Sequence, residues 1–315
     1  MRSAVRVFFA TLFSIGMLFA SGPAQADTPD PVNWPKPRFV TYNVCGSVCA
    51  VYEGSKTAWR DKVVSAMDNW DADLVMLQEM CYGQWTLLRD SLEDRSSGNK
   101  YDSVWGATLA SADGCAKWGT DQRFGLATFA KGGPGTINNG SRTVDLLPEA
   151  TPAENRILLC ARTTVTGRAV RACNTHIDYR GDNPKVQIQK VADITRDYAN
   201  QGDPVVLAGD FNQLPKDVDM APLYNHGGGT GVFQEVDEND KSYFTGTECP
   251  QSGDRCRSGE ATAEKGCSPH VSEPGKIDYI FLSYYWFTTV RGDAAACTTG
   301  LSDHHLLRGA AAWEH

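Results

Sequence analysis

Residues 204–212 read Pro204-Val205-Val206-Leu207-Ala208-Gly209-Asp210-Phe211-Asn212. Four consecutive apolar residues between a proline and a glycine are typical of a short strand buried on both faces. An acid and an amide follow directly, and neither is stable in a core without a partner. A simple turn would account for the same residues, since Gly, Asp and Asn all favour turns. Repetition of the pattern elsewhere in the chain decides between these interpretations.

Polar side chains stand at the edges of the other predicted strands too. Predicted strands over 38–42 and 73–78 are each followed by one, as is a predicted hairpin over 157–175. Strands over 277–282 and 306–313 begin beside acidic residues. Because antiparallel neighbours bring the start of one strand and the end of another to the same sheet edge, we expect these side chains to line one cleft. They are Asn43, Glu79, His176, Asp210, Asn212, Asp278, Asp303 and His304.

This set offers carboxylate and amide oxygens together with two imidazoles. Oxygen ligands suit Mg²⁺, Mn²⁺ or Ca²⁺ better than zinc. A carboxylate beside a histidine raises its pKa, which gives the pair acid–base capacity near neutral pH. A cation, an oriented water and two imidazoles together favour displacement at phosphorus. Any one of these residues alone is more often structural than a ligand, but their repetition favours a site.

The remaining elements indicate an α/β chain with several antiparallel hairpins. Apolar spacing predicts helices over 56–70, 84–92 and 184–200, and further strands over 101–109, 123–129 and 287–291. Residues 213–274 are rich in Gly, Asp and Ser and have no clear periodicity, which is typical of a long functional loop. Such a mixture predicts two packed sheets covered by helices.

The chain resembles the endonuclease/exonuclease/phosphatase superfamily of DNase I-like enzymes. Its matching motifs occur in the order of that family and span residues 38–313. They are Thr41-Tyr42-Asn43, Leu77-Gln78-Glu79, Asn174-Thr175-His176, Gly209-Asp210-Phe211-Asn212, Lys276-Ile277-Asp278 and Leu301-Ser302-Asp303-His304. The resemblance implies a four-layer α/β/β/α sandwich, with two mixed or antiparallel sheets flanked by helices, as one domain over 38–315 after an extension over 27–37.

The resemblance also implies roles for the strand-edge residues. Glu79 would be the principal ligand of a divalent cation, usually Mg²⁺ with Mn²⁺ or Ca²⁺ as alternatives, and Asp303 and Asn43 would lie in or near its shell. Asp210 and Asn212 would orient the attacking water and the phosphate.

The same resemblance gives roles to the two histidines. His304, held by Asp278, would act as a base or stabilise charge in the transition state. His176 would bind a phosphate oxygen or help to protonate the leaving group.

One position departs from the pattern of the DNase I-like nucleases. These enzymes place a Glu before the Arg of the central strand to hold the first catalytic His, whereas this chain has Gln122-Arg123. Gln cannot favour imidazolium charge as a carboxylate does. Asp121 could substitute in a different register. For Arg123, contact with a phosphate and a structural ion pair are both open.

The first residues are typical of a secretory signal peptide. Arg2 and Arg6 precede an apolar run, and Ala24-Gln25-Ala26 is a cleavage site of the Ala-x-Ala type. We therefore expect residues 1–26 to be removed and the protein to be secreted. An even count of ten cysteines, all after this segment, indicates disulfides in an exported chain.

One disulfide follows from strand geometry. If Thr166 and Gly167 form the loop of the 157–175 hairpin, Cys160 lies opposite Cys173 at a non-hydrogen-bonded position, with Cα atoms about 4.5 Å apart. Cys45 and Cys49 are close enough in sequence to pair, and the other pairings stay open.

Charge and composition bear on the substrate. The net charge is −8, and removing Arg2 and Arg6 brings it to about −10, which argues against non-specific affinity for a polyanion. A phosphate ester substrate remains compatible, because a bound cation neutralises its carboxylate ligands. The leading hypothesis is a secreted, metal-dependent phosphodiesterase, a nuclease acting on DNA or RNA as a monomer, with no protein partner inferred.

Three other functions are alternatives. A sphingomyelinase-like phospholipid hydrolase predicts that the aromatic stretch Tyr284-Tyr285-Trp286-Phe287 is exposed, whereas core and edge packing is the structural interpretation. A phosphomonoesterase acting on inositol phosphates or nucleotides comes next. A catalytically dead binding protein is the least favoured, since all of the strand-edge residues are present.

Overall fold

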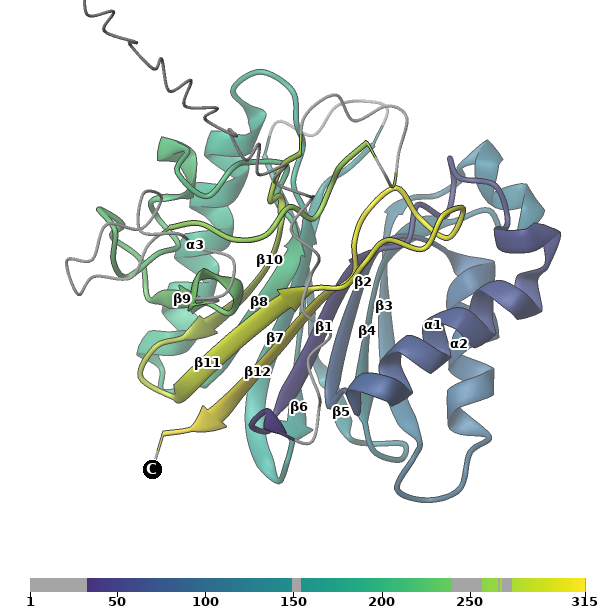
Figure 1. Cartoon of the computed structure of the whole chain (residues 1–315), viewed down its shortest axis with the longest axis horizontal. Helices are drawn as coiled ribbons and strands as arrows, with labels where there is room; N and C mark the ends of the chain where they lie inside the picture. The colour runs from purple at the N-terminus through teal and green to yellow at the C-terminus, as the bar shows by residue number, and fades with distance from the viewer. Residues whose placement is uncertain (1–32, 149–153, 240–256, 266, 268–273, 315) are drawn as a thin grey trace, which may run out of the picture.

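Two six-stranded sheets pack face to face in the protein, with helices on both outer faces (Figure 1). The computed structural model describes residues 33–148, 154–239, 257–265, 267 and 274–314. Helices α1 (Lys56–Trp70) and α2 (Tyr82–Glu93) cover one sheet, and α3 (Asn183–Asn200) covers the other. The predicted four-layer α/β/β/α sandwich is confirmed.

The first sheet has the strand order β11-β12-β1-β2-β4-β3. Its strands are β1 (Arg38–Asn43), β2 (Leu74–Cys81), β3 (Tyr101–Leu109), β4 (Phe124–Lys131), β11 (Phe287–Ala294) and β12 (Leu307–Trp313). β1 and β2 run parallel, and the other pairs are antiparallel. Every residue of β1 is buried, as expected for a central strand covered on both faces.

The second sheet has the order β5-β6-β7-β8-β10-β9. Its strands are β5 (Ile137–Leu146), β6 (Ile157–Val165), β7 (Arg168–His176), β8 (Val205–Asp210), β9 (Phe233–Glu235) and β10 (Asp278–Ser283). β7 and β8 are parallel, with α3 as their crossover. Short 3₁₀ helices lie between the larger elements: η2 (Tyr52–Gly54), η3 (Asp113–Lys117), η4 (Val218–Met220) and η5 (Asp237–Asn239).

Helix α1 shows how local sequence produces the outer layers. Ser55 accepts a hydrogen bond from the backbone N–H of Ala58 and so caps the N-terminus. Apolar side chains recur on one face and are buried against the sheet: Trp59, Val63, Met67 and Trp70. Asp71 ends the helix in the left-handed conformation.

A pair of buried amides joins the two sheets beneath their common edge. Nε2 of Gln78 on β2 donates to Oδ1 of Asn174 on β7 over 2.8 Å. Nδ2 of Asn174 donates in turn to the carbonyls of Leu77 and Ala127 in the opposite sheet, over 3.1 and 2.8 Å. Hydrogen bonds of this kind satisfy buried polar groups and fix how one sheet lies on the other.

The hairpin prediction is confirmed in detail. Val165 pairs with Arg168, and both residues of the loop have positive φ, 46° for Thr166 and 83° for Gly167. That conformation matches a two-residue turn whose twist suits the flanking strands. Cys160 lies opposite Cys173 and is bonded to it, with Cα atoms 4.1 Å apart.

Sequence periodicity missed two strands of the second sheet. β5 is an edge strand whose residues 138–146 are mostly exposed, so it carries no apolar alternation. β9 has only three residues and lies inside the stretch expected to be loop. The other predicted elements are observed, with boundary shifts of a few residues.

Disulfides hold several loops in the described part of the chain. The expected Cys45–Cys49 pair is present, and Cys81–Cys115 and Cys267–Cys297 are two further pairs. The predicted signal peptide lies outside the described residues, as do Cys249 and Cys256. None of the described helices has the length and apolar character needed to cross a bilayer.

Candidate active site

Strand register brings three predicted residues together in the second sheet. Asp210 ends β8, and its direct neighbours are His176 at the end of parallel β7 and Asp278 at the start of antiparallel β10. The start of β10 and the ends of β7 and β8 therefore share one sheet edge, as the sequence predicted.

The facing sheet contributes its residues at the same edge. Asn43 ends β1, and Glu79 lies near the end of parallel β2, where the pairing with β4 is interrupted between Leu77 and Met80. Glu79 has a φ of 53°, in the left-handed region. Such a conformation costs a non-glycine residue about 1–3 kcal/mol, and residues strained in this way tend to cluster at active sites. The strained backbone of Glu79 therefore coincides with the interruption of the β2–β4 pairing, where its carboxylate joins the site.

Asn43 connects the two halves of the site. Its Nδ2 donates to Oε1 of Glu79 over 3.0 Å and to Oδ2 of Asp210 over 3.1 Å, and it lies 3.5 Å from Nε2 of His304. Its amide oxygen accepts from the backbone N–H of Cys45. In this arrangement Asn43 is a donor to two carboxylates, and its role as a metal ligand stays a prediction.

His304 and Asp278 form a hydrogen-bonded pair. Nδ1 of His304 lies 2.8 Å from Oδ2 of Asp278, and Nε2 lies 3.7 Å from Oδ2 of Asp210. Burial alone would lower the pKa of His304, but the Asp278 and Asp210 carboxylates outweigh it and raise the pKa to about 10. The imidazole is therefore charged at neutral pH.

Thr262, in the long loop, holds this pair in place. Its buried Oγ1 accepts from the backbone N–H groups of Ile277 and Asp278, over 3.0 and 2.9 Å. Its carbonyl accepts from the N–H of His305, over 2.7 Å. One loop residue thus joins the start of β10 to the segment that carries His304. Sequence reasoning did not find Thr262, because nothing in its local pattern marks it.

His176 has a partner that sequence reasoning also missed. Nη1 of Arg156, a buried residue at the start of β6, lies 2.7 Å from Nδ1 of His176. Burial and the charge of Arg156, together with His304, hold the pKa of His176 well below 6.5. Since a guanidinium can only donate, Nδ1 accepts and the single proton of the neutral ring lies on Nε2. Nε2 lies 3.4 Å from Oδ2 of Asp210.

The residues expected to support His176 lie elsewhere. Gln122 accepts a hydrogen bond from Ser111, and Asp121 pairs with Arg123 over 2.6 Å. The suggestion that Asp121 replaces the missing Glu is therefore wrong, because its carboxylate is engaged by Arg123. Arg123 stacks on the ring of Tyr82, with 4.0 Å from Cζ to the ring centroid. Its contact with a phosphate stays a prediction.

Asp210 and Asn212 lie between the two histidines. Oδ1 of Asp210 accepts from the backbone N–H of Asn212, whose φ is 51°. Nδ2 of Asn212 donates to the carbonyl of Ile177 and lies 3.3 Å from Nε2 of His176. Burial, followed by the charge of Asp278, raises the pKa of Asp210 to about 7. A buried carboxylate with such a pKa can exchange protons near neutral pH.

The donor set fits a hard divalent cation. Burial raises the pKa of Glu79; the hydrogen bond from Asn43 and the charge of His304 oppose that rise, and the nearby Asp303 carboxylate adds to it. Asp210 and Asp278 also place carboxylate oxygens within 4.8 Å of each other beside His304, and Oδ1 of Asp278 is buried without a hydrogen-bond partner among the described residues. Carboxylate oxygens of this kind suit Mg²⁺, Mn²⁺ or Ca²⁺.

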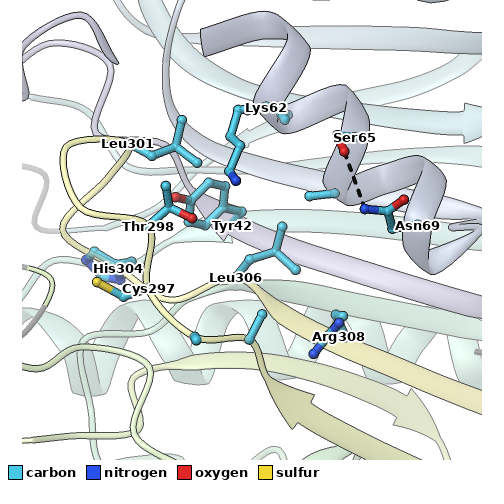
Figure 2. Close-up of a pocket in the computed structure, with 14 residues that line it drawn as sticks. Tyr42, Lys62, Ser65, Asn69, Cys297, Thr298, Leu301, His304, Leu306 and Arg308 are labelled. Carbon is cyan, nitrogen blue, oxygen red and sulfur yellow. Dashed lines mark hydrogen bonds between the residues drawn. The ribbon is translucent and has the colours of Figure 1, made fainter. Parts of the chain in front are cut away.

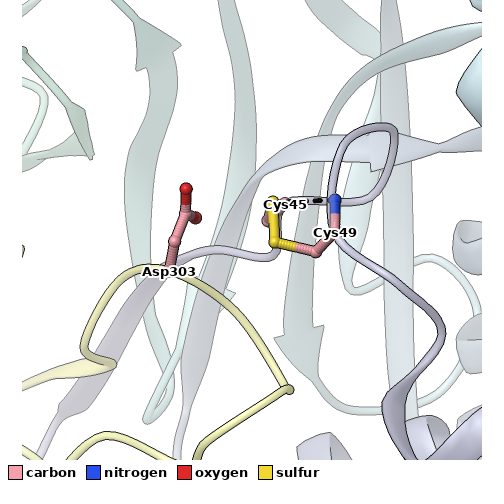
Figure 3. A group of neighbouring side chains, drawn as sticks. All are labelled: Cys45, Cys49 and Asp303. Carbon is pink, nitrogen blue, oxygen red and sulfur yellow. Dashed lines mark hydrogen bonds between the residues drawn. A yellow bond between two sulfur atoms is a disulfide. The ribbon is translucent and has the colours of Figure 1, made fainter. Parts of the chain in front are cut away.

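A second cluster, made of Asp303, Cys45 and Cys49, cannot bind a cation through its cysteines. Figure 3 shows Asp303 beside Cys45 and Cys49, whose sulfurs are bonded to each other and offer no thiolate. The same holds for Glu264, Cys267 and His305, because Cys267 is bonded to Cys297.

A cavity of about 210 Å³ borders His304 on the side of α1. Figure 2 shows Lys62 of α1 extending toward Tyr42, and Leu301 and Leu306 also line the cavity. Arg308 adds a second cation to the lining. Space for part of a substrate therefore exists beside the histidine.

Comparisons with known proteins agree with this geometry. Residues 40–304 match the sequence model of the Endonuclease/Exonuclease/phosphatase family, a span that contains every predicted site residue. The carbon catabolite repressor protein 4 homolog 6 of Arabidopsis thaliana is 29% identical over 179 residues. That alignment covers 53% of this chain but only 22% of the plant protein, so the chain spans about a fifth of that relative's length.

Solved structures share the fold at low sequence identity. TDP2 of D. rerio, complexed with a single-strand DNA product, is 15% identical with a TM-score of 0.57, over 86% of this chain and 97% of that one. The mannosyl-6-phosphatase Bt3783 of Bacteroides thetaiotaomicron is 16% identical with a TM-score of 0.58, over 88% and 99%. At these identities the likeness establishes the fold alone.

Proposed function

Because the chain belongs to the Endonuclease/Exonuclease/phosphatase family, we propose that it is a secreted, metal-dependent phosphodiesterase that hydrolyses extracellular nucleic acid. One observation carries the proposal: carboxylates and imidazoles from both sheets meet at one edge, with Asn43 joining Glu79 to Asp210 and Asp278 holding a charged His304. That arrangement supplies what displacement at phosphorus needs.

The side chains have distinct tasks in this reaction. Asp210 accepts a proton from the attacking water, since its pKa of about 7 suits a base at neutral pH. His304 offers an N⁺–H to the phosphate, where negative charge grows in the transition state. His176 is neutral and directs its Nε2–H into the site, so it binds a phosphate oxygen rather than acting as an imidazolium acid.

Glu79 and Asp303 would hold the divalent cation, with Asp210 nearby. When bound, the cation supplies Lewis-acid stabilisation of charge on the phosphate oxygens. The choice among Mg²⁺, Mn²⁺ and Ca²⁺ is part of the proposal, and Mg²⁺ is the first to test.

Two observations support a diester in a nucleic acid over a lipid. The D. rerio relative of the same fold was solved with a single-strand DNA product. The aromatic stretch that a lipid hydrolase would expose is mostly packed: Phe287 is buried and Trp286 lies against the core, which leaves Tyr285 exposed. This turn follows Ser283, at the opposite end of β10 from Asp278 and about 20 Å away along a six-residue strand.

A paired substrate assay tests the proposed function. Supercoiled plasmid, single-stranded DNA, RNA and sphingomyelin vesicles are each incubated with the mature chain and Mg²⁺. Nucleic acid cleavage is expected, with complete loss in EDTA and in His304→Ala. His305→Gln is the matched control, because His305 is adjacent but its Nδ1 lies 2.8 Å from the carbonyl oxygen of Ala295 and its Nε2 3.2 Å from Oε1 of Glu264.

The possible results separate the candidates. Turnover of sphingomyelin with intact DNA and RNA would favour the phospholipid hydrolase. Hydrolysis of phosphate monoesters alone would favour the phosphatase activity carried by the Bacteroides structure of the same fold. If nucleic acid is still cleaved by His304→Ala, the role of His304 in stabilising charge on the phosphate is wrong.

A further inference from the structure

A groove of about 660 Å³ lies between α2 and the edge strand β3, outside the catalytic cluster. Three aromatic side chains and three arginines contribute to its lining. They are Tyr82, Trp85, Arg89, Trp105, Arg123 and Arg142. The catalytic assignments above use none of the aromatic residues.

The aromatic rings form one connected group. Trp85 and Trp105 are stacked, with centroids 6.2 Å apart and planes at 30°. Tyr82 meets the edge of Trp105 at 5.1 Å and lies 5.2 Å from Trp85. Nε1 of Trp85 donates to Oγ of Ser103, which fixes the orientation of its ring. A rigid aromatic platform of this kind suits stacking on planar ligands.

Arginines lie over all three of these rings. Cζ of Arg89 is 4.6 Å from the Trp85 ring centroid, and Cζ of Arg123 is 4.0 Å from that of Tyr82. Arg142 donates to the carbonyl of Trp105. An incoming base can take the place of Arg89 on the face of Trp85, and the displaced guanidinium then meets the adjacent phosphate.

Acidic residues accompany the arginines of this groove. Glu93 and Asp102 also line it, and Arg89 and Arg123 pair with Asp90 and Asp121. The Asp102 carboxylate is occupied by the backbone N–H groups of Gly135 and Ile137, each at 2.9 Å. Phosphate binding in this groove therefore rests on the individual guanidinium groups, which donate to phosphate oxygens, and not on a net positive charge.

The groove is anchored close to the candidate metal ligand. Tyr82 follows Glu79 by three residues, about 10 Å along an extended strand. The backbone N–H of Tyr82 donates to the carbonyl of Arg123, and the Cys81–Cys115 disulfide holds the adjacent turn. A chain cleaved at the site would reach this groove within a few nucleotides.

We propose that this groove binds the flanking nucleotides of single-stranded nucleic acid, with a base stacked on Trp85 and phosphates on Arg89 and Arg142. The inference rests on the proposed phosphodiesterase function and names its substrate class. Stacking on a side chain requires an unpaired base, since a base inside a duplex already has both faces covered. The groove therefore selects single strands over duplexes.

Binding is measured by fluorescence anisotropy of a labelled oligothymidylate, with a duplex of the same length as the comparison. All proteins carry His304→Ala in the mature chain so that the probe stays intact. Trp85→Ala is expected to weaken single-strand binding about five- to a hundredfold, the range for loss of one stacked base, while Trp85→Phe retains most of it. Arg89→Gln is expected to lower the salt slope of log K by about 0.7, the contribution of one phosphate.

Arg60→Gln is the matched control. Arg60 on α1 pairs with Asp61 at 2.6 Å, as Arg89 pairs with Asp90 at 2.6 Å, and the two arginine side chains are 27% and 29% exposed. Of Arg60 and Arg89, it is Arg89 that lies over an aromatic ring of the groove. The Arg60 variant should bind like the parent.

Small-substrate kinetics separate the two proposals. With His304 restored, Trp85→Phe and Arg89→Gln should hydrolyse bis(p-nitrophenyl) phosphate at the parental rate, because this substrate is too small to reach the groove.

Equal binding by Trp85→Ala, Arg89→Gln and parent overturns the groove proposal, as does a preference for duplex. If bis(p-nitrophenyl) phosphate is hydrolysed but no oligonucleotide binds, the groove proposal fails and phosphodiester hydrolysis stands. If oligonucleotide binds and no diester is hydrolysed, the proposed function fails instead.

Discussion

The guanidinium of Arg156 lies 2.7 Å from Nδ1 of His176, with both side chains buried. A cation in this position opposes a second positive charge on the ring and fixes which nitrogen carries the proton. Burial and the charge of Arg156 lower the pKa of His176 and keep its ring neutral, whereas Asp278 keeps His304 charged. Opposite environments of this kind assign separate tasks to chemically identical residues.

Replacing Arg156 tests this division directly. In Arg156→Gln we expect the pKa of His176 to rise, because the adjacent positive charge is gone. ¹⁵N NMR of the rings should find the neutral Nε2–H form at pH 7 in the parent, and a titration toward acid should show that the ring gains its second proton at a higher pH in the variant than in the parent. Arg156→Lys, which keeps the charge, should keep the ring neutral. A fully protonated His176 in the parent at pH 7 would contradict the assignment.

Restoring the Glu that the sequence lacks should have no effect. Gln122 bonds to Ser111 and makes no hydrogen bond to His176 in the described structure. In Gln122→Glu, kcat and KM on a diester substrate should stay within about twofold of the parent, since a change in protonation at His176 needs a nearby charge. A gain of tenfold or more would mean that the Gln122 side chain reaches His176 during the reaction.

The Asp278–His304 pair predicts a pH effect with a definite sign. The Asp278 carboxylate helps to raise the pKa of His304 to about 10, so the parent keeps the imidazolium from neutral pH up to that value. In Asp278→Asn the pKa falls toward its ordinary value of about 6.5. Activity of the variant should then decline as the pH rises through neutrality, and kcat at pH 8 should drop about 10²- to 10⁴-fold. A pH profile parallel to that of the parent would contradict the role of charged His304.

We expect activation of the enzyme by a divalent cation to depend chiefly on Glu79. Dialysis against EDTA should abolish activity, and Mg²⁺ should restore it. Glu79→Gln should shift the Mg²⁺ activation curve to higher concentration, because a neutral amide is a weaker ligand for a hard cation. The thermal shift on adding Mg²⁺ gives an independent reading, since a ligand that binds the native state raises Tm. Parental Mg²⁺ response in the variant would exclude Glu79 as the principal ligand.

Thr262 provides a test of the loop that supports His304. Thr262→Val keeps the shape but removes the acceptor for the N–H groups of Ile277 and Asp278, and each unsatisfied group costs about 1–3 kcal/mol. Urea unfolding should report this loss, and kcat should fall because Asp278 is less well placed. Thr262→Ser keeps the hydroxyl and should recover both properties. Stability lost without any change in kcat would limit Thr262 to a structural role.

Much of the fold follows from local pattern. Helix 56–70 and strand 101–109 are observed with the predicted bounds, because each has clear periodicity and well-defined ends. The edge strand β5 was missed because one face lies in solvent and the other is only partly covered, so its residues need not alternate. Three-residue β9 is too short to produce a period.

The sequence by itself identified most of the side chains that the structure brings together in the candidate site. Asn43, His176 and Asp210 end buried strands and Asp278 begins one, and a polar group at such a position is visible in a single chain segment. Only the tertiary structure decided the state of each group. Arg156 reaches His176 because β6 and β7 pair in one particular register, and Thr262 reaches Asp278 across a long loop. Protonation depends on charges brought near by such distant contacts, and no local pattern encodes them.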